Sequence, residues 1–176
     1  MTDLTAVTLR PWQKHDILAL AQLADNYKIA QNLRDSFPSP YTIADAQKWV
    51  ACNLEYPEPN PIRAIDYNGN LVGCAAAFLK DDVLRKNAEI GYWLGEQYWG
   101  KGIATVAVGL LVDYLFNNFD VHRVYAEVFG YNQASCRVLV KNRFVQEAVL
   151  RECIYKNGKF HDNLVFALRR GDWTLK

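Results

Sequence analysis

The sequence predicts an α+β fold, a mixed sheet with helices on its faces, and two kinds of pattern indicate it. Asn68-Gly69 and Asn157-Gly158 each separate two strand-like runs, and Asn-Gly is the strongest short signal of an antiparallel hairpin. Between these hairpins, strand-like residues 88–94 lead through a loop to a helical pattern from residue 103 and then to strand-like residues 122–129. This order predicts a right-handed crossover between two parallel strands. Hairpins on both sides of a crossover favour a mixed sheet over a doubly wound one.

The other elements follow in chain order. Residues 5–12 predict a first strand, and Asp16 is expected to cap a helix whose apolar residues recur through Ala24. A second helical region follows, in which Thr42 is a good N-cap for a helix to about residue 54. The stretch "YPEPNP", residues 56–61, contains three prolines and predicts a surface connection. Asn132 is expected to open a short helix.

Composition narrows the class of protein. The chain has 176 residues, which suits one domain, and its 20 Lys and Arg against 19 Asp and Glu leave a net charge of +1. This charge argues against nucleic acid or an anionic membrane as the main partner, and favours a small molecule or a protein. The start of the chain is not a basic, apolar leader, and no window approaches about 18 apolar residues, so we expect a cytoplasmic protein.

The four cysteines and three histidines give no sign of a metal site. Cys52, Cys74, Cys136 and Cys153 stand far apart without a C-x-x-C pair, which predicts buried free thiols in a reducing compartment. The histidines, at positions 15, 122 and 161, are too scattered to share a metal ion, and we expect structural or surface roles for them.

The stretch "GEQYWGKG", residues 95–102, matches seven of the eight positions of the phosphate-binding loop of nucleoside triphosphatases. The eighth position requires Ser or Thr to ligate magnesium, and here it is Gly102, which argues against a triphosphatase. Two interpretations remain. The glycines either let backbone N–H groups surround a phosphate at the start of the next helix, without a metal, or they form a turn that only begins that helix.

The same residues resemble a known family. Gln97-x-x-Gly100-x-Gly102 followed by Ile103-Ala104 resembles the acetyl-coenzyme A signature of the GNAT acyltransferase superfamily. The longer string "AEIGYWLGEQYWGKGIATVAV", residues 88–108, is similar to its Rim-type (RimJ/RimL-like) branch, which includes ribosomal-protein N-terminal-alanine acetyltransferases. "NQASCRVLVKNRF", residues 132–144, and the closing hairpin continue the similarity. The resemblance implies a single GNAT domain over residues 1–176, with a mostly antiparallel seven-stranded sheet, helices on both faces and one central parallel strand pair.

The resemblance also implies how acetyl-coenzyme A is held as cosubstrate. Backbone N–H groups near Trp93 and Leu94 would face the thioester carbonyl, and Asn132 would hydrogen-bond the pantetheine arm or serve only as an N-cap. The pyrophosphate would lie against the loop that begins the helix, formed by Gln97, Gly100, Lys101, Gly102, Ile103 and Ala104.

For the chemistry, the resemblance implies that Glu89 takes the proton of the amine, or that it pairs with a lysine or faces solvent instead. Many relatives return a proton to the thiolate from a tyrosine seven residues after the helix-opening asparagine, and here that position is Leu139. Ser135 is the catalytic candidate that remains, either contacting the sulfur or holding a water; the alternative is an ordinary serine at a helix start. Rim-type relatives carry Gly where this chain has Arg143. Either Arg143 adopts the left-handed conformation that ends the helix, or Asn142, which tolerates it better, takes over that position, as we expect.

These residues predict an N-acetyltransferase that moves an acetyl group to a primary amine, a protein N-terminus or a small amine, by direct attack. The alternative is a coenzyme A-binding sensor without turnover, which the missing tyrosine leaves open. We expect no metal, no nucleic acid and no membrane, and a monomer or homodimer. His161 would border the acceptor groove in such a fold. The aromatic residues Tyr27, Phe37, Tyr41 and Trp49 either line an acceptor pocket or belong to the core.

Overall fold

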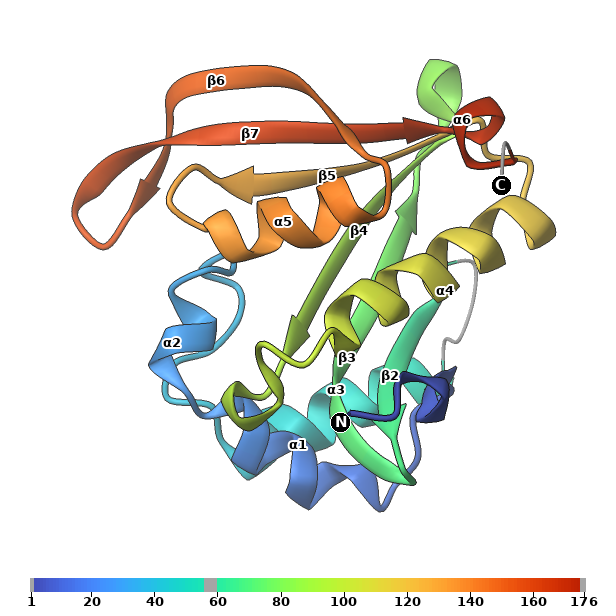
Figure 1. The fold of residues 1–176 in the computed structure, drawn as a ribbon. Helices are drawn as coiled ribbons and strands as arrows, with labels where there is room; N and C mark the ends of the chain where they lie inside the picture. The colour runs from blue at the N-terminus through green and yellow to red at the C-terminus, as the bar shows by residue number, and fades with distance from the viewer. Residues whose placement is uncertain (1, 56–59, 175–176) are drawn as a thin grey trace. The chain divides into compact units, whose positions relative to one another are not determined.

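The computed structural model describes residues 2–55 and 60–174, and Figure 1 traces its elements. A seven-stranded sheet has the order β1-β2-β3-β4-β5-β7-β6, in which β4 and β5 are parallel. The mixed, mostly antiparallel α+β fold predicted from the sequence is thereby confirmed. The strands are β1 (Val7–Arg10), β2 (Ile62–Tyr67), β3 (Asn70–Leu79), β4 (Asn87–Leu94), β5 (Arg123–Phe129), β6 (Val145–Lys156) and β7 (Lys159–Arg169). The α-helices are α1 (Asp16–Ala24), α2 (Tyr27–Ala30), α3 (Ile43–Glu55), α4 (Ile103–Asn118), α5 (Gln133–Lys141) and α6 (Arg170–Thr174), and short 3-10 turns cover Leu4–Ala6, Asp82–Leu84 and Glu96–Tyr98.

The described chain forms two compact units. The N-terminal unit comprises the described residues up to Ala76 together with Tyr92–Ala107, and the C-terminal unit comprises Ala77–Gly91 together with the described residues from Val108 onward. Strands β3 and β4 and helix α4 contribute residues to both units.

In the N-terminal unit, helices α1 and α3 bury their apolar sides against β2 and β3. Thr42 caps α3 as predicted, because its Oγ1 accepts the backbone N–H of Asp45 at 3.2 Å and the Asp45 carboxylate accepts the N–H of Thr42 at 2.9 Å. Residues 56–59 of the predicted "YPEPNP" connection lie outside the described residues. The buried cluster of this unit consists of Trp12, Leu20, Ala21, Leu23, Ala24, Tyr41, Ala46, Val50, Ala64, Leu71, Cys74 and Ala76.

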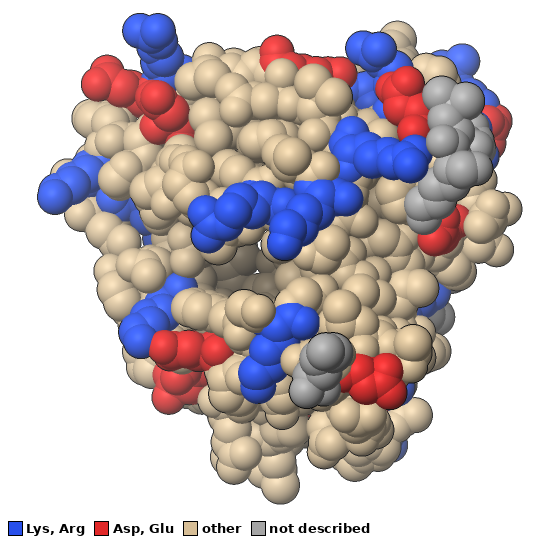
Figure 2. All heavy atoms as spheres, in the orientation of Figure 1, with Lys and Arg blue, Asp and Glu red and all other residues tan. Residues whose placement is uncertain are grey.

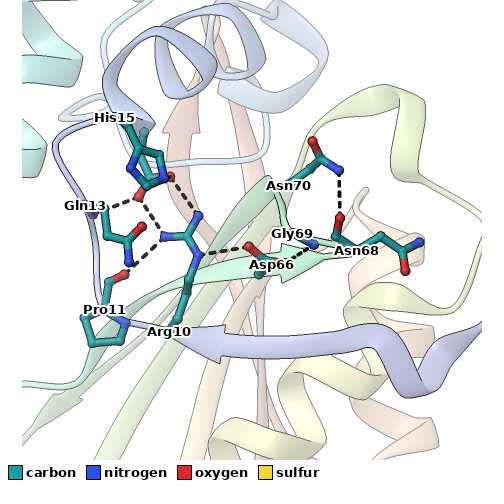
Figure 3. Close-up of polar contacts among 9 residues, drawn as sticks. Arg10, Pro11, Gln13, His15, Asp66, Asn68, Gly69 and Asn70 are labelled. Carbon is teal, nitrogen blue, oxygen red and sulfur yellow. Dashed lines mark hydrogen bonds and ion pairs between the residues drawn. The ribbon is translucent and has the colours of Figure 1, made fainter.

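A buried charged network fastens the start of α1 to the sheet (Figure 3). The Arg10 guanidinium donates two hydrogen bonds to the Asp16 carboxylate, at 2.8 and 2.7 Å, and a third to Asp66 at 2.9 Å. The prediction that Asp16 caps the helix is wrong: His15 precedes the first helical residue, and Asp16 instead accepts the Gln13 N–H at 2.8 Å and the two bonds from Arg10. Burial alone would raise the pKa of Asp16, but these hydrogen bonds outweigh it and lower the pKa.

The C-terminal unit packs α5 and the second half of α4 on the face of the sheet that carries Val124, Ala126 and Leu168. Arg170 closes the end of α4, because its guanidinium donates to the carbonyl oxygen of Phe116 in the last turn and to those of Phe119 and Val121 just after the helix. The long β6–β7 hairpin is orange to red in Figure 1.

The backbone at both hairpin turns agrees with the sequence. Asn68 and Gly69 have φ of 55° and 76°, and Asn157 and Gly158 have φ of 52° and 76°. Two successive positive φ values define the type I′ turn that joins antiparallel strands tightly.

The end of α5 differs from the prediction. Arg143 adopts the left-handed conformation, with φ of 65°, whereas Asn142 has φ of −94°. The N–H of Phe144 donates to Leu139 O at 3.1 Å and the N–H of Arg143 to Val140 O at 2.9 Å, which is the Schellman pattern with Arg143 at the position that glycine usually holds. The Asn142 side chain has a different role, since its buried Nδ2 donates a hydrogen bond to Val138 O at 3.0 Å.

Strand β6 lies at the edge of the sheet and is interrupted twice. Its pairing with β7 shifts between Gln146 and Ala148 and again between Leu150 and Ile154. Within the second interruption Glu152 has φ of 51°, and its N–H donates to an Asp162 carboxylate oxygen at 2.9 Å. These are β-bulges, which bend an edge strand and break its ladder.

The cysteine prediction is right in one respect only. All four cysteines are free thiols, but Cys52 and Cys153 are exposed and only Cys74 and Cys136 are buried. Burial raises the pKa of Cys74 to about 12. The face drawn in Figure 2 carries both basic and acidic side chains among a largely uncharged surface, as a net charge of +1 predicts. No helix in the described ranges has the length and apolar character needed to cross a membrane.

Candidate functional site

The loop before α4 presents a row of free backbone donors. Gly100 and Gly102 have φ of 74° and 84°, a conformation that L side chains rarely adopt, and α4 begins at Ile103. Within the described chain, the N–H groups of residues 100–104 donate to no acceptor. A Cβ added to Gly102 would also come within 3.3 Å of the Leu4 side chain. Free N–H groups at the positive end of a helix form an anion site, and the residues present therefore fit a pyrophosphate.

The turn that precedes these donors is fixed on two sides. The Glu96 carboxylate accepts hydrogen bonds from Lys28 Nζ and, at 2.8 Å, from Asn26 Nδ2, and the Lys28 bond is the main reason that the pKa of Glu96 is lowered. The Trp99 indole donates to Leu94 O at 2.8 Å, which ties the loop back to the end of β4. Gln97 and Lys101 remain exposed, and Lys101 Nζ lies 5.6 Å from the centre of the Tyr98 ring.

Trp93 and Leu94, the residues predicted to face the thioester, end β4 in the N-terminal unit. Leu94 is buried, and the Trp93 ring contacts the Phe37 ring edge-on at 5.9 Å. Strand β3 passes very close to them, because a Cβ placed on Gly73 would lie 2.1 Å from Trp93 O. Glycine at position 73 therefore sets the position of this segment of β4.

Glu89 lies in the C-terminal unit within a polar cluster. One oxygen of its carboxylate is 2.7 Å from Lys80 Nζ and accepts a longer hydrogen bond, 3.4 Å, from the Tyr125 hydroxyl. The hydrogen bond to Glu89 raises the pKa of Lys80, so the lysine is protonated at neutral pH. Arg123 lies over the Tyr125 ring, 4.8 Å from its centre. An ion pair with a lysine was one of the alternatives to the role of base that the sequence left open for Glu89.

Asn132 and Ser135 begin α5. Asn132 Oδ1 accepts the Ser135 N–H at 3.1 Å, so Asn132 is an N-cap, and this leaves its amide nitrogen to meet a ligand. Ser135 is half-buried. Leu139, at the place of the family's tyrosine, is fully buried in the core and supplies no proton.

The structure thus brings the predicted residues into two groups. Trp93, Leu94 and the loop from Gln97 to Ala104 lie in the N-terminal unit, and Glu89, Asn132 and Ser135 lie in the C-terminal unit. In the C-terminal unit the parallel pairing ends with Glu89 opposite Tyr125, whereas Asn132 follows β5 three residues after Phe129. About 13 Å of strand separates the levels of Tyr125 and Phe129.

Sequence reasoning missed Lys80, Tyr125, Glu127 and Asn163. The alternation of polar residues in strand-like residues 122–129 marks one polar face and was a signal for Tyr125 and Glu127. Lys80 and Asn163 lie outside that stretch, and their position beside it depends on strand register. His161 contacts the Tyr131 ring edge-on, with ring centres 4.7 Å apart. Tyr41 is buried and Phe37 and Trp49 pack against the same core, while Tyr27 is exposed.

Among the described residues, no three His, Cys, Asp or Glu side chains are grouped closely enough to hold a metal ion.

Known proteins are similar to this chain in sequence and in fold. Residues 6–145 match the acetyltransferase (GNAT) domain family. The N-acetyltransferase YokL of Bacillus subtilis (strain 168) is 32% identical over 171 residues, which cover 96% of this chain and 93% of YokL. The ribosomal-protein-serine acetyltransferase of Escherichia coli (strain K12) is 30% identical over 91 residues, 52% of this chain and 51% of that protein. A solved structure of the ribosomal L7/L12 α-N-protein acetyltransferase RimL with coenzyme A is 26% identical, covers 96% of both chains and has a TM-score of 0.82. The chain therefore belongs to the GNAT family of acetyl-coenzyme A-dependent N-acetyltransferases.

Proposed function

We propose that residues 1–176 act as one domain that transfers the acetyl group of acetyl-coenzyme A to a primary amine, either a protein N-terminus or a small amine, by direct attack. The observation that carries this proposal is the run of free N–H groups from Gly100 to Ala104, held by two left-handed glycines at the start of α4. It offers a phosphate site that needs no metal. The acceptors named for relatives, ribosomal proteins and in one fold neighbour spermidine, support an amine of either kind.

Each candidate residue has a task in this proposal. The N–H groups of Gly100, Lys101, Gly102, Ile103 and Ala104, with Gln97, hold the pyrophosphate, and those near Trp93 and Leu94 polarise the carbonyl under attack. Bound acetyl-coenzyme A supplies an activated acyl group as its thioester. The Asn132 amide nitrogen orients the pantetheine arm.

The amine is mostly protonated at neutral pH, and a base must take its proton before or during attack. Glu89 has this role in the proposal, directly or through a water. Its carboxylate lies 2.7 Å from Lys80 Nζ and has further lone pairs that can accept a hydrogen bond from an ammonium group. Ser135, half-buried in the first turn of α5, contacts the sulfur or holds the water that protonates it.

The test is acceptor-dependent release of free thiol. Acetyl-coenzyme A is incubated with the protein and, separately, with short peptides that have a free N-terminus, with polyamines, with amino sugars and with amino acids. Because Cys52 and Cys153 are exposed, the thiol reagent is added after quenching, against a protein-only baseline. We expect thiol release and an acetylated product, identified by mass, with at least one acceptor class. Coenzyme A binding without release for any amine would favour a sensor, the function that Leu139 in place of the tyrosine keeps open.

A further inference from the structure

The side-chain oxygen of Asn163 on β7 is buried and receives no hydrogen bond from a donor in the described chain. Asn163 is 3% exposed, and its Nδ2 donates to Glu127 Oε2 at 2.9 Å. Because a carboxylate only accepts, the amide nitrogen must face Glu127 and Oδ1 must point elsewhere. That oxygen is enclosed and accepts no hydrogen bond from the described chain. Buried polar atoms are nearly always paired, so an unpaired one requires an explanation.

The register of the strands places this amide on the same face as Glu89. Tyr125 is opposite Glu89 in the β4–β5 pair, and Phe129 is opposite Asn163 in the β5–β7 pair. Residues 125, 127 and 129 share one face because side chains alternate along a strand. Glu89, Glu127 and Asn163 therefore follow one another on that face. Together they present two carboxylates and one amide oxygen without a hydrogen-bond donor to the N–H groups of a ligand.

Aromatic rings continue the same surface beyond Asn163. Tyr131, 41% exposed, contacts the Phe129 ring at 5.8 Å and the half-buried His161 at 4.7 Å, and His161 precedes Asn163 by two residues on β7. Carboxylates beside ring faces suit a ligand rich in N–H groups.

The second buried orphan in the described chain lacks this setting. Trp12 Nε1 belongs to the apolar core of the N-terminal unit, where the Trp12 ring meets Trp49 edge-on.

We propose that Asn163 determines acceptor specificity, and that its Oδ1 accepts a hydrogen bond from an N–H group of the acceptor other than the nitrogen that is acetylated. This rests on the proposed function, in which the reacting amine lies at Glu89. The levels of Tyr125 and Phe129 are about 13 Å apart along β5, and an extended peptide advances about 3.4 Å per residue. With the reacting amine at Glu89, an N–H group two to four residues inside a peptide N-terminus, or an inner nitrogen of a polyamine, can therefore reach the level of Asn163. When no acceptor substrate is bound, Asn163 Oδ1 is enclosed. Neighbouring side chains must therefore move apart before this oxygen can accept a hydrogen bond from the substrate.

The experiment measures binding by calorimetry to protein loaded with coenzyme A, so it does not depend on turnover. The probes are pentaalanine amide, its four singly N-methylated forms at residues 2 to 5, and spermidine. Each is measured with wild type and with Asn163→Leu, which keeps side-chain size and removes the amide; Asn163→Ala serves if the leucine variant does not fold. Asn142→Leu is the matched control, since it removes another buried asparagine amide of the same unit, one that already donates to Val138 O.

We expect one N-methylation to weaken binding to wild type about tenfold, the value of one ordinary hydrogen bond. The same methylation should change binding to Asn163→Leu less than about twofold, while Asn142→Leu should behave as wild type. If instead spermidine binds and loses affinity only in the Asn163 variants, the inner amine is the donor and the inference holds. Equal methylation losses in wild type and Asn163→Leu, or no binding of any probe, would overturn it. Thiol release separately decides whether the chain is an active acetyltransferase.

Discussion

Lys80 and Glu89 form an ion pair in which Lys80 Nζ lies 2.7 Å from a carboxylate oxygen. Substituting either residue removes the ion pair, but only substituting Glu89 also removes the proposed base. Comparing the two variants therefore separates a structural role of Glu89 from a catalytic one. Glu89→Gln and Lys80→Met should lower the free energy of unfolding by similar amounts. Only Glu89→Gln should lose turnover, by roughly 10²- to 10⁴-fold for a general base, with coenzyme A affinity unchanged.

The deficit of Glu89→Gln should also shrink as pH rises towards the amine's own pKa, near 10 for an alkylamine, because more free amine is then present without help from the protein. Steady-state rates between pH 6 and about 10 with the best acceptor measure this. Wild-type turnover in Glu89→Gln across the range, or equal losses in both variants, would leave Glu89 a structural role.

Gly102→Val should abolish the thermal stabilisation by coenzyme A. A hundredfold excess over Kd stabilises the folded state by about 2.7 kcal/mol, which raises Tm by roughly 5 to 11 °C in a chain of this size. Wild type should show this rise in the presence of EDTA. Valine at a φ of 84° is strained, and its side chain would cover the free N–H groups.

Gly158→Val provides the control for strain, because Gly158 has a φ of 76° in the β6–β7 turn. It should lower Tm without changing the shift caused by coenzyme A. An equally large shift with ATP and magnesium would instead favour the nucleoside triphosphatase interpretation of this loop.

Gly73→Ala should destabilise the protein and weaken coenzyme A binding together. The new Cβ would lie 2.1 Å from Trp93 O and 2.9 Å from Leu94 Cα, so β3 or β4 must move, at about 1–3 kcal/mol. Gly91→Ala in β4 is the matched control, since nothing lies within 4 Å of its Cβ, and it should change stability by less than about 0.5 kcal/mol. Urea unfolding and calorimetric titration test both; normal coenzyme A affinity in Gly73→Ala would show that the Trp93–Leu94 segment is not part of the site.

Arg143→Gly should raise the free energy of unfolding by about 1 kcal/mol, because glycine has no Cβ to strain at a φ of 65°. Asn142→Gly should do the opposite, since it loses the hydrogen bond to Val138 O and has an ordinary φ. Thermal unfolding of both variants is sufficient. A stability loss in Arg143→Gly would mean that the arginine side chain outweighs the backbone strain.

Asp16→Asn should lower stability by about 1–3 kcal/mol at neutral pH, because it removes the charge that accepts two hydrogen bonds from Arg10, while the bond from Arg10 to Asp66 remains. The pKa of Asp16 is lowered in the folded state, so its contribution is complete above the unfolded value of about 3.9 and is lost as pH falls through the folded value. Urea unfolding from pH 7 down to about 3 should show the gap between variant and wild type closing only at the acidic end. A gap that is constant over this range would exclude the carboxylate charge as its source.

The sequence predicted what local chemistry determines. Both Asn-Gly turns, the Thr42 cap and the glycine loop follow from residues adjacent in the chain. Errors arose where a side chain bonds to a partner that the capping pattern does not include. Asp16 accepts hydrogen bonds from Arg10 and does not cap α1, and Asn142 donates its amide to Val138 O while Arg143 takes the strained position. The Lys80–Glu89 pair and the Asn163 amide depend on strand register, which spacing alone does not give.

The two interruptions of β6 have a consequence for how this protein behaves at high concentration. A twelve-residue strand at the border of a sheet, with Val145, Val149 and Leu150 exposed, is a template on which another molecule's strand can grow. The bulges divide that template into segments too short and too bent to be copied, and the left-handed Glu152 turns a main-chain donor inward to Asp162. Irregularity in this strand therefore opposes pairing of β6 with the edge strand of another molecule, and straightening β6 should increase the tendency to associate through this edge.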